Sequence, residues 1–183
     1  MEFATLKKVK FLAVILLLPL LTSCGSTVAN KVTPTAKVEL PTSCESASVF
    51  AEIKKEIPGS QFINTPWNPA PDSELFDVLK NGGLACSYGL QSAEIGVTVR
   101  WVKDLGFYDR WSKEWMKSGY QVVNLSEYGL GQGYFLAKPQ SATQEFNLWN
   151  LNFLQNRVWV SLSKTTPGDL SSARSLIESL LSK

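Results

Sequence analysis

Histidine does not occur anywhere in the 183 residues of this chain. Its absence excludes Ser-His-Asp triads, histidine general bases and the commonest protein ligand of zinc. No GxSxG element surrounds a serine, so a hydrolase nucleophile of that kind is not predicted. The chain has only three cysteines, and none lies in a CxxC spacing. These absences do not exclude catalysis by carboxylates or binding without catalysis. No metal or cofactor is predicted.

The amino-terminal segment has the three parts of an export signal. Three lysines within residues 7–10 form a basic start, residues 11–21 form an apolar run interrupted only by Pro19, and small residues follow. The run is shorter than the roughly 20 apolar residues of a membrane span. The pattern predicts a cleaved signal peptide over residues 1–23. The alternatives are an uncleaved anchor or a buried helix.

The end of this segment, Leu21-Thr22-Ser23-Cys24, resembles the lipobox of bacterial lipoproteins. The resemblance implies cleavage between Ser23 and Cys24 and a diacylglyceryl group on the Cys24 sulfur. Two acyl chains anchor a protein stably in a membrane. Because the segment before Cys24 is predicted to be an export signal, the anchored chain is expected on the outer side of that membrane. In the lipoproteins that this segment resembles, an Asp at the position of Gly25 would favour the inner membrane of a two-membrane cell. Its absence is compatible with an outer-membrane address or with a cell that has one membrane.

The charge of the chain after cleavage is balanced. Removal of residues 1–23 leaves 160 residues, enough for one domain with its own core. The removed segment holds three of the 18 basic and one of the 16 acidic residues, which leaves 15 of each sign. A chain without net charge has no general electrostatic attraction to nucleic acid or to anionic lipid. Nucleic acid is therefore not a predicted partner, and the membrane is expected to be reached through Cys24.

With Cys24 lipidated, Cys44 and Cys86 remain as a pair. Outside the cytoplasm such a pair is normally oxidised. The disulfide would close a loop of about 40 residues and stabilise the fold by about 4 kcal/mol in the chain-entropy model. The alternative is a redox or metal-binding pair, which the long spacing disfavours.

The chain after the signal divides into a tether and one domain. Residues 24–41 are rich in Thr, Ser, Val and Lys without a period, which predicts a flexible tether with a reach of about 23 Å. Residues 42–183 are predicted to form a single domain. Thr42 and Glu45 have the spacing of a capping box, and helical periodicity follows until Pro58.

Helical and strand patterns are mixed along the domain rather than alternating regularly. Further helices are predicted within residues 73–80, 104–118 and 167–181. Six strands are predicted over residues 84–90, 95–101, 120–125, 132–137, 146–154 and 157–163. The last two are expected to form a hairpin that turns at Gln155 and Asn156. This order predicts an α+β fold: one mainly antiparallel sheet of about six strands, helices packed on it and one disulfide.

The layout resembles the small two-cysteine lipoproteins of actinobacteria. In these proteins a lipobox and a Thr/Ser tether precede a helix carrying one cysteine. The second cysteine lies at a strand start, here Ala85-Cys86-Ser87-Tyr88. Many of them have no assigned activity, and related folds serve as extracytoplasmic sensor or accessory domains. The resemblance implies binding rather than catalysis and names no ligand.

Six tryptophans are the most distinctive residues of the domain. Aromatic side chains stack on sugars or line acyl pockets, and they also fill small sheet–helix cores. Core packing is predicted for most of them, including Trp101. Trp67 lies in a loop, and Trp159 lies on the strand face opposite to Val158 and Val160. Trp67 and Trp159 are therefore predicted as a possible exposed contact patch.

A glycine cluster and several acidic residues are two further candidates for a functional site. Residues 129–133 form a glycine cluster, but a strand rather than a helix is predicted after it, which favours a loop over a phosphate site. A glycosidase-like pair of carboxylates is defined by separation in space, which the sequence leaves open. Its candidates are Glu94, Asp104, Asp109, Glu114, Glu127 and Glu145.

These observations predict a membrane-anchored extracytoplasmic lipoprotein whose domain binds a cell-envelope protein, glycan or lipid without catalysing a reaction. One alternative is a carboxylate-dependent hydrolase acting on envelope glycans. A pocket with two facing acids would favour it. The other alternative is a purely structural envelope component.

Overall fold

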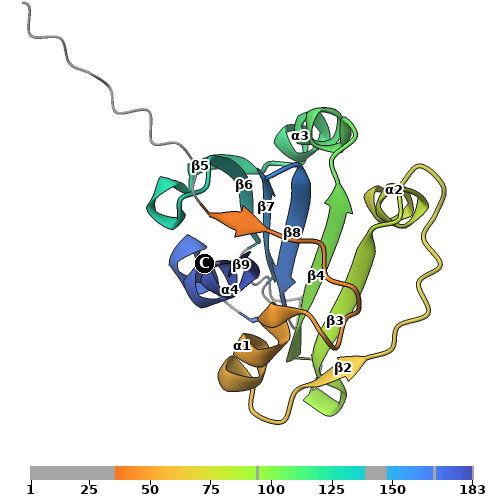
Figure 1. The fold of residues 1–183 in the computed structure, drawn as a ribbon, viewed down its shortest axis with the longest axis vertical. Coiled ribbons are helices and arrows are strands. Elements are labelled where there is room, and N and C mark those ends of the chain that lie inside the picture. Colours follow the sequence, from red (N-terminus) through yellow and green to blue (C-terminus); the bar gives the residue numbers. More distant parts are fainter. Residues whose placement is uncertain (1–35, 94, 139–147, 167, 183) are drawn as a thin grey trace, which may run out of the picture. The chain divides into compact units, whose positions relative to one another are not determined.

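The computed structural model describes residues 36–93, 95–138, 148–166 and 168–182. The predicted α+β fold is confirmed, with a seven-stranded antiparallel sheet, packed helices and a disulfide between Cys44 and Cys86. The strands follow each other across the sheet in the order β2-β3-β4-β8-β7-β6-β5 (Figure 1). Their bounds are Gln61–Ile63 (β2), Leu84–Leu90 (β3), Ile95–Lys103 (β4), Gln121–Asn124 (β5), Gln132–Lys138 (β6), Leu148–Gln155 (β7) and Val158–Lys164 (β8).

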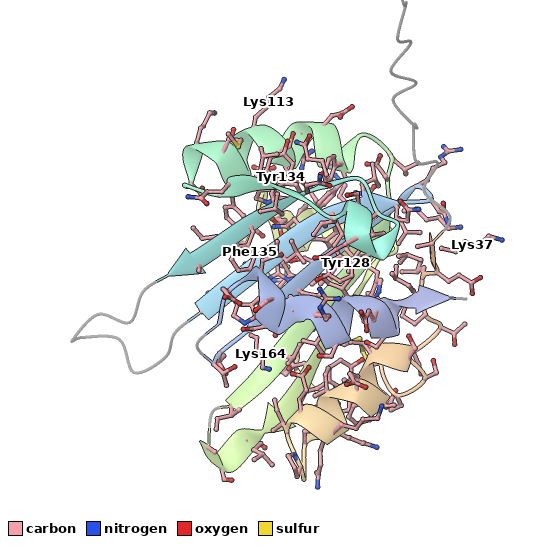
Figure 2. All side chains as sticks on the ribbon, turned by 90° about the vertical axis from the view of Figure 1, so that its left-hand side faces the viewer. Lys37, Lys113, Tyr128, Tyr134, Phe135 and Lys164 are labelled. Carbon is pink, nitrogen blue, oxygen red and sulfur yellow. A yellow bond between two sulfur atoms is a disulfide. The ribbon has the colours of Figure 1, made fainter. Side chains whose placement is uncertain are left out.

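The sheet lies between two layers of helices. Helices α1 (Ser48–Glu56) and α4 (Arg174–Leu180) cover one face, and α2 (Glu74–Lys80) and α3 (Phe107–Lys117) cover part of the other (Figure 1). Figure 2 shows the layers from the side, with α3 above the sheet and α4 and α1 below it. Since neighbouring residues of a strand point to opposite faces, Tyr134 packs in the α3 layer and Phe135 in the α4 layer.

The larger core lies beneath α1 and α4. Ile53 of α1 and Ile177 of α4 are fully buried against the central strands β4, β8 and β7. Trp101 of β4 points into this core, as predicted, and is 1% exposed. Burial of each such side chain contributes roughly 1.5–3 kcal/mol, so this face supplies most of the hydrophobic stabilisation.

The smaller core forms between the other face and the helices α2 and α3. It consists of Val78, Val102, Phe107, Trp115 and Trp159. The prediction that Trp159 is exposed is wrong, because its indole is 0% exposed between β8 and α3. Val158 and Val160 alternate with Trp159 as predicted, but the face on which Trp159 lies is covered by a second helical layer.

The folded domain begins before Thr42. Strand β1 (Lys37–Val38) pairs antiparallel with β9 (Leu181–Ser182), and Val38 is buried in the larger core. The end of the predicted tether over residues 24–41 therefore belongs to the domain. The sequence does not predict this pairing, because β1 and β9 have two residues each and are far apart in the chain.

Helix α1 begins at Ser48 rather than at Thr42. The predicted capping box is replaced by a turn in which Ser43 and Ser46 exchange hydrogen bonds between side chains and backbone amides. Cys44 lies in this turn and is bonded to Cys86 on β3. The carbonyl of Cys44 also accepts a hydrogen bond from the Tyr88 hydroxyl at 2.7 Å. These two links hold the turn on the sheet, so the helix starts only after it.

The β7–β8 hairpin turns one residue later than predicted. Asn156 and Arg157 have φ angles of 50° and 63°, whereas Gln155 is the last residue of β7. Two consecutive left-handed residues are characteristic of the type I′ turn, whose twist matches that of the flanking strands.

Candidate functional site

The predicted contact patch of Trp67 and Trp159 is not present. Trp159 is buried in the smaller core. Trp67 is half-buried, and its indole N–H donates to the carbonyl of Ala85 at 2.9 Å. Trp67 therefore fastens the loop after β2 to the start of β3. Cys24 lies outside the described residues, whereas the Cys44–Cys86 disulfide is present.

The candidate acids do not meet in a cavity. Asp104 accepts a hydrogen bond from the amide of Tyr108, Glu114 pairs with Lys117, and Glu127 pairs with Arg174. Asp109 is exposed in the first turn of α3, and Glu94 and Glu145 lie outside the described residues. Neither of the two cavities described below holds two carboxylates.

The glycine cluster forms a loop, as predicted. A short 3₁₀ helix (Ser126–Tyr128) ends at Gly129, whose φ is 70°, and strand β6 follows from Gln132. Gly133 lies inside β6, where a Cβ atom would come within 2.7 Å of the Leu125 side chain. The glycine therefore allows close packing of the strand rather than binding of a phosphate.

The larger cavity, called the amide cavity here, lies beside the edge strand β2 and has a volume of about 650 Å³. Its walls come from β2, from the end of β3 and from the connection between β3 and β4. The lining residues are Gly59, Gln61, Phe62, Ile63, Asn64, Gly89, Leu90, Gln91 and Ser92. The volume lies within the range typical of small-ligand sites.

The chemistry of the amide cavity is polar but uncharged. Gln61, Asn64 and Gln91 supply three carboxamides, and each carboxamide both donates and accepts hydrogen bonds. Phe62 and Leu90 add apolar surface. None of the lining residues is a carboxylate, a cation or a cysteine. The cavity is therefore suited to a ligand with hydroxyl or amide groups and no formal charge.

Glycine is needed where the amide cavity meets the sheet. Gly89 of β3 has a φ of 158°, and a Cβ atom there would lie 2.1 Å from the carbonyl oxygen of Ile95. The missing side chain lets β3 and the beginning of β4 approach closely at the cavity wall. Gly59, with a φ of 86°, ends the stretch after α1 and turns the chain into β2.

A second cavity of about 300 Å³, called the basic pocket here, lies at the opposite end of β4. It is lined by Asp77, Lys80, Asn81, Lys103, Leu105, Gly106, Phe107 and Arg110. Asp77 is buried, pairs with Arg110 and accepts a hydrogen bond from the Trp111 indole at 2.9 Å. The carboxylate thus compensates Arg110, while Lys80 and Lys103 add positive charge to the rim.

A polar cluster lies between the smaller core and the central strands. Glu74 at the start of α2 accepts hydrogen bonds from Arg100 of β4 and from the indole of Trp115, both at 2.7 Å. Burial raises the pKa of the neighbouring Tyr120 to about 12, with a further contribution from Glu74 that Arg100 and Asn152 oppose. The side chains satisfy one another, so we assign this cluster to the docking of α2 and α3 on the sheet.

Sequence reasoning missed both cavities. The amide cavity depends on β2, a three-residue strand hidden in a stretch rich in Pro and Asn. The basic pocket depends on Lys80 and Lys103 meeting across two segments. The available signals were the carboxamides Gln61, Asn64 and Gln91 and the leucine at 105 between a strand and a helix, and neither is specific without coordinates.

Comparisons with protein-family models, with curated proteins and with solved structures return no match for this chain. Within the described residues, no helix is both long and apolar enough to span a membrane. The same residues contain no group of three or more Cys, Asp or Glu side chains placed to hold a metal ion.

Proposed function

We propose that this chain is a lipoprotein, anchored on the outer side of a bacterial membrane by lipid on Cys24, whose domain binds an uncharged envelope ligand. The amide cavity carries the proposal for binding. Its volume of about 650 Å³ and its three carboxamides suit a hydroxyl-rich group such as a segment of an envelope glycan. The lipobox-like Leu21-Thr22-Ser23-Cys24 supports the anchoring.

The binding role is favoured over hydrolysis because the amide cavity offers no pair of acids. A glycosidase needs one carboxylate on each side of the scissile bond, roughly 5–9.5 Å apart. Asp104, Glu114 and Glu127 are instead engaged with separate partners, and Asp109 is exposed on α3 outside both cavities.

The anchoring is tested with Cys24→Ser. We expect the variant to remain unprocessed or to leave the membrane fraction, because the acyl chains attach through that sulfur. Cell fractionation and mass spectrometry of the amino-terminal peptide measure this. Normal cleavage together with unchanged membrane retention would refute the lipid anchor.

The ligand is tested by photo-crosslinking in intact cells. A photoreactive residue replaces Gln91 in the wall of the amide cavity, and a control replaces Lys113, which is exposed on α3 (Figure 2). We expect an adduct with glycan chemistry from position 91 only, and at least a severalfold loss of it when Asn64→Ala is added. A protein adduct from position 91 would favour the accessory-protein alternative. Equal adducts from both positions would contradict the cavity as a binding site.

A further inference from the structure

Leu105 is the most exposed large apolar side chain of the described residues. It lies in the loop between β4 and α3, and it is 73% exposed, compared with 50% for Met116 and for Val122. A single exposed leucine is ordinary on a protein surface. Leu105 differs because it lines the basic pocket together with Lys80, Lys103 and Arg110, three cations from three separate segments.

The positive charge of the basic pocket is local. Asp77 is the only carboxylate among the lining residues, and it is already engaged by Arg110 and Trp111. Lys80 lies over the ring of Phe76, and Lys103 forms no ion pair with the described residues. Two further acids flank the pocket in sequence, Asp104, which caps α3 through the Tyr108 amide, and Asp109, but neither is among the lining residues. Three cations thus gather around an exposed apolar side chain at one place.

The first described residue of the chain lies at the same end of the sheet. The carbonyl of Ala36, the first described residue, accepts a hydrogen bond from the side chain of Gln155 at the end of β7. The adjoining hairpin reaches the Leu105 loop, because the amide of Asp104 donates to the carbonyl of Arg157 at 2.7 Å. Only residues 25–35 separate Ala36 from Cys24 in the sequence, so the proposed lipid anchor keeps this end of the sheet near the membrane.

We infer that the basic pocket holds the phosphate of an anionic phospholipid of the anchoring membrane while Leu105 enters the acyl layer. The inference rests on the proposed lipid anchor and adds the partner and the orientation of the domain. Cations beside an exposed apolar side chain match the two layers of a membrane surface, phosphate outside and hydrocarbon inside. A soluble anion could bind the cations, but it has no apolar surface that would cover the Leu105 side chain.

The orientation follows from the length of β4. The basic pocket lies beyond Lys103, and the amide cavity lies before Ile95 at the other end of the strand. Nine residues of a strand span about 30 Å. With Leu105 at the membrane, the amide cavity opens about that far from the bilayer, toward the envelope.

The test uses the full lipoprotein, reconstituted into vesicles of phosphatidylcholine with or without phosphatidylglycerol. Leu105→Cys carries a polarity-sensitive fluorophore, since the three native cysteines are expected to be blocked by lipid or by the disulfide. Gln91→Cys carries the same fluorophore as the control at the other end of β4. We expect a blue shift of the Leu105 label in vesicles with phosphatidylglycerol, at least twice that in phosphatidylcholine alone, and no shift of the Gln91 label.

Charge variants identify the headgroup site. Lys80→Glu combined with Lys103→Glu is expected to remove the phosphatidylglycerol-dependent part of the shift. The matched control, Lys54→Glu combined with Lys55→Glu on α1, should leave it unchanged. A Leu105 label that stays in water in both vesicles overturns the inference while the anchor stands. A shift that is insensitive to phosphatidylglycerol and to both lysines also overturns it. Failure of the protein to remain on any vesicle would refute the anchor itself.

Discussion

The indole rings of Trp115 on α3 and Trp159 on β8 stack with their centroids 6.0 Å apart and their planes 10° from parallel. Phe107 lies against the same Trp159 ring, with centroids 4.5 Å apart. This contact joins a helix to the centre of the sheet and closes the face that would otherwise be open to solvent. The smaller core is built around these contacts between α3 and Trp159.

Truncation of Trp159 should therefore be costly. Trp159→Ala is expected to lower the free energy of unfolding by about 3–5 kcal/mol, because it leaves a cavity beneath α3. Chemical denaturation measures this, and Leu105→Ala is the control, expected within about 0.5 kcal/mol of the wild type because that side chain is exposed. Equal effects of the two changes would mean that α3 does not cover Trp159 in solution.

The disulfide should contribute a large part of the stability. Reduction is expected to cost about 4 kcal/mol, since Cys44 and Cys86 are 42 residues apart and their bond limits the unfolded chain. Denaturation with and without reductant gives the difference. Alkylation and mass spectrometry of protein from intact cells should find neither thiol free. Two alkylated cysteines would contradict the pairing.

The ion pair between Lys164 and Glu56 joins β8 to α1 with an N···O distance of 2.5 Å, and Glu56 also accepts a hydrogen bond from Ser175 of α4. The two side chains are only 12% and 18% exposed. Lys164→Met alone should cost about 2 kcal/mol because it leaves a largely covered carboxylate without its cation. The double change with Glu56→Leu should recover most of this loss. A double-mutant cycle in which the two losses simply add would show that the pair is not coupled.

Stability should fall at alkaline pH. Burial raises the pKa of Tyr120 from 10.0 to about 12, and burial also raises the pKa of Tyr88 and of Tyr108. Above pH 10 the unfolded chain loses these protons while the folded chain keeps them, so the unfolded state binds fewer protons and is favoured as the pH rises. The stabilisation of the neutral form of Tyr120 is complete below pH 10 and is lost by about pH 12.

Denaturant titrations across this range measure the decline. Tyr120→Phe cannot ionise and should give a shallower decline than the wild type between pH 10 and pH 12. Identical slopes for the two proteins would show that the Tyr120 hydroxyl is not buried in solution.

Much of the local structure could be predicted because it depends on neighbours in sequence. Ser73 caps α2 through the amide of Phe76, and β4 buries Val97, Val99 and Trp101 at every second position, as its alternation indicates. Gly119, with a φ of 88°, follows the end of α3. These features need only helical and strand periodicity and the conformational freedom of glycine.

Features that depend on a second layer were not predicted correctly or not predicted at all. The sequence of β8 separates its two faces, but it does not say whether a helix covers the second one, so Trp159 was assigned to solvent. Strand β2 has three residues and no clear alternation, and it is a strand because β3 offers it an edge. The amide cavity and the basic pocket also depend on tertiary packing, because their walls come from segments that meet only in the folded chain.

The sequence by itself determined the α+β class, the strand periodicity and the pairing of Cys44 with Cys86, and it predicts the lipid anchor. Composition and local spacing carry these features, since each follows from residues within one segment or from the number of cysteines. The tertiary structure alone decided that Leu105, Lys80 and Lys103 line one pocket at the end of the sheet where Ala36 lies, and that the amide cavity lies at the other end of β4. The physical reason is that strand order and helix packing bring together groups far apart in the chain, and no local pattern records that order.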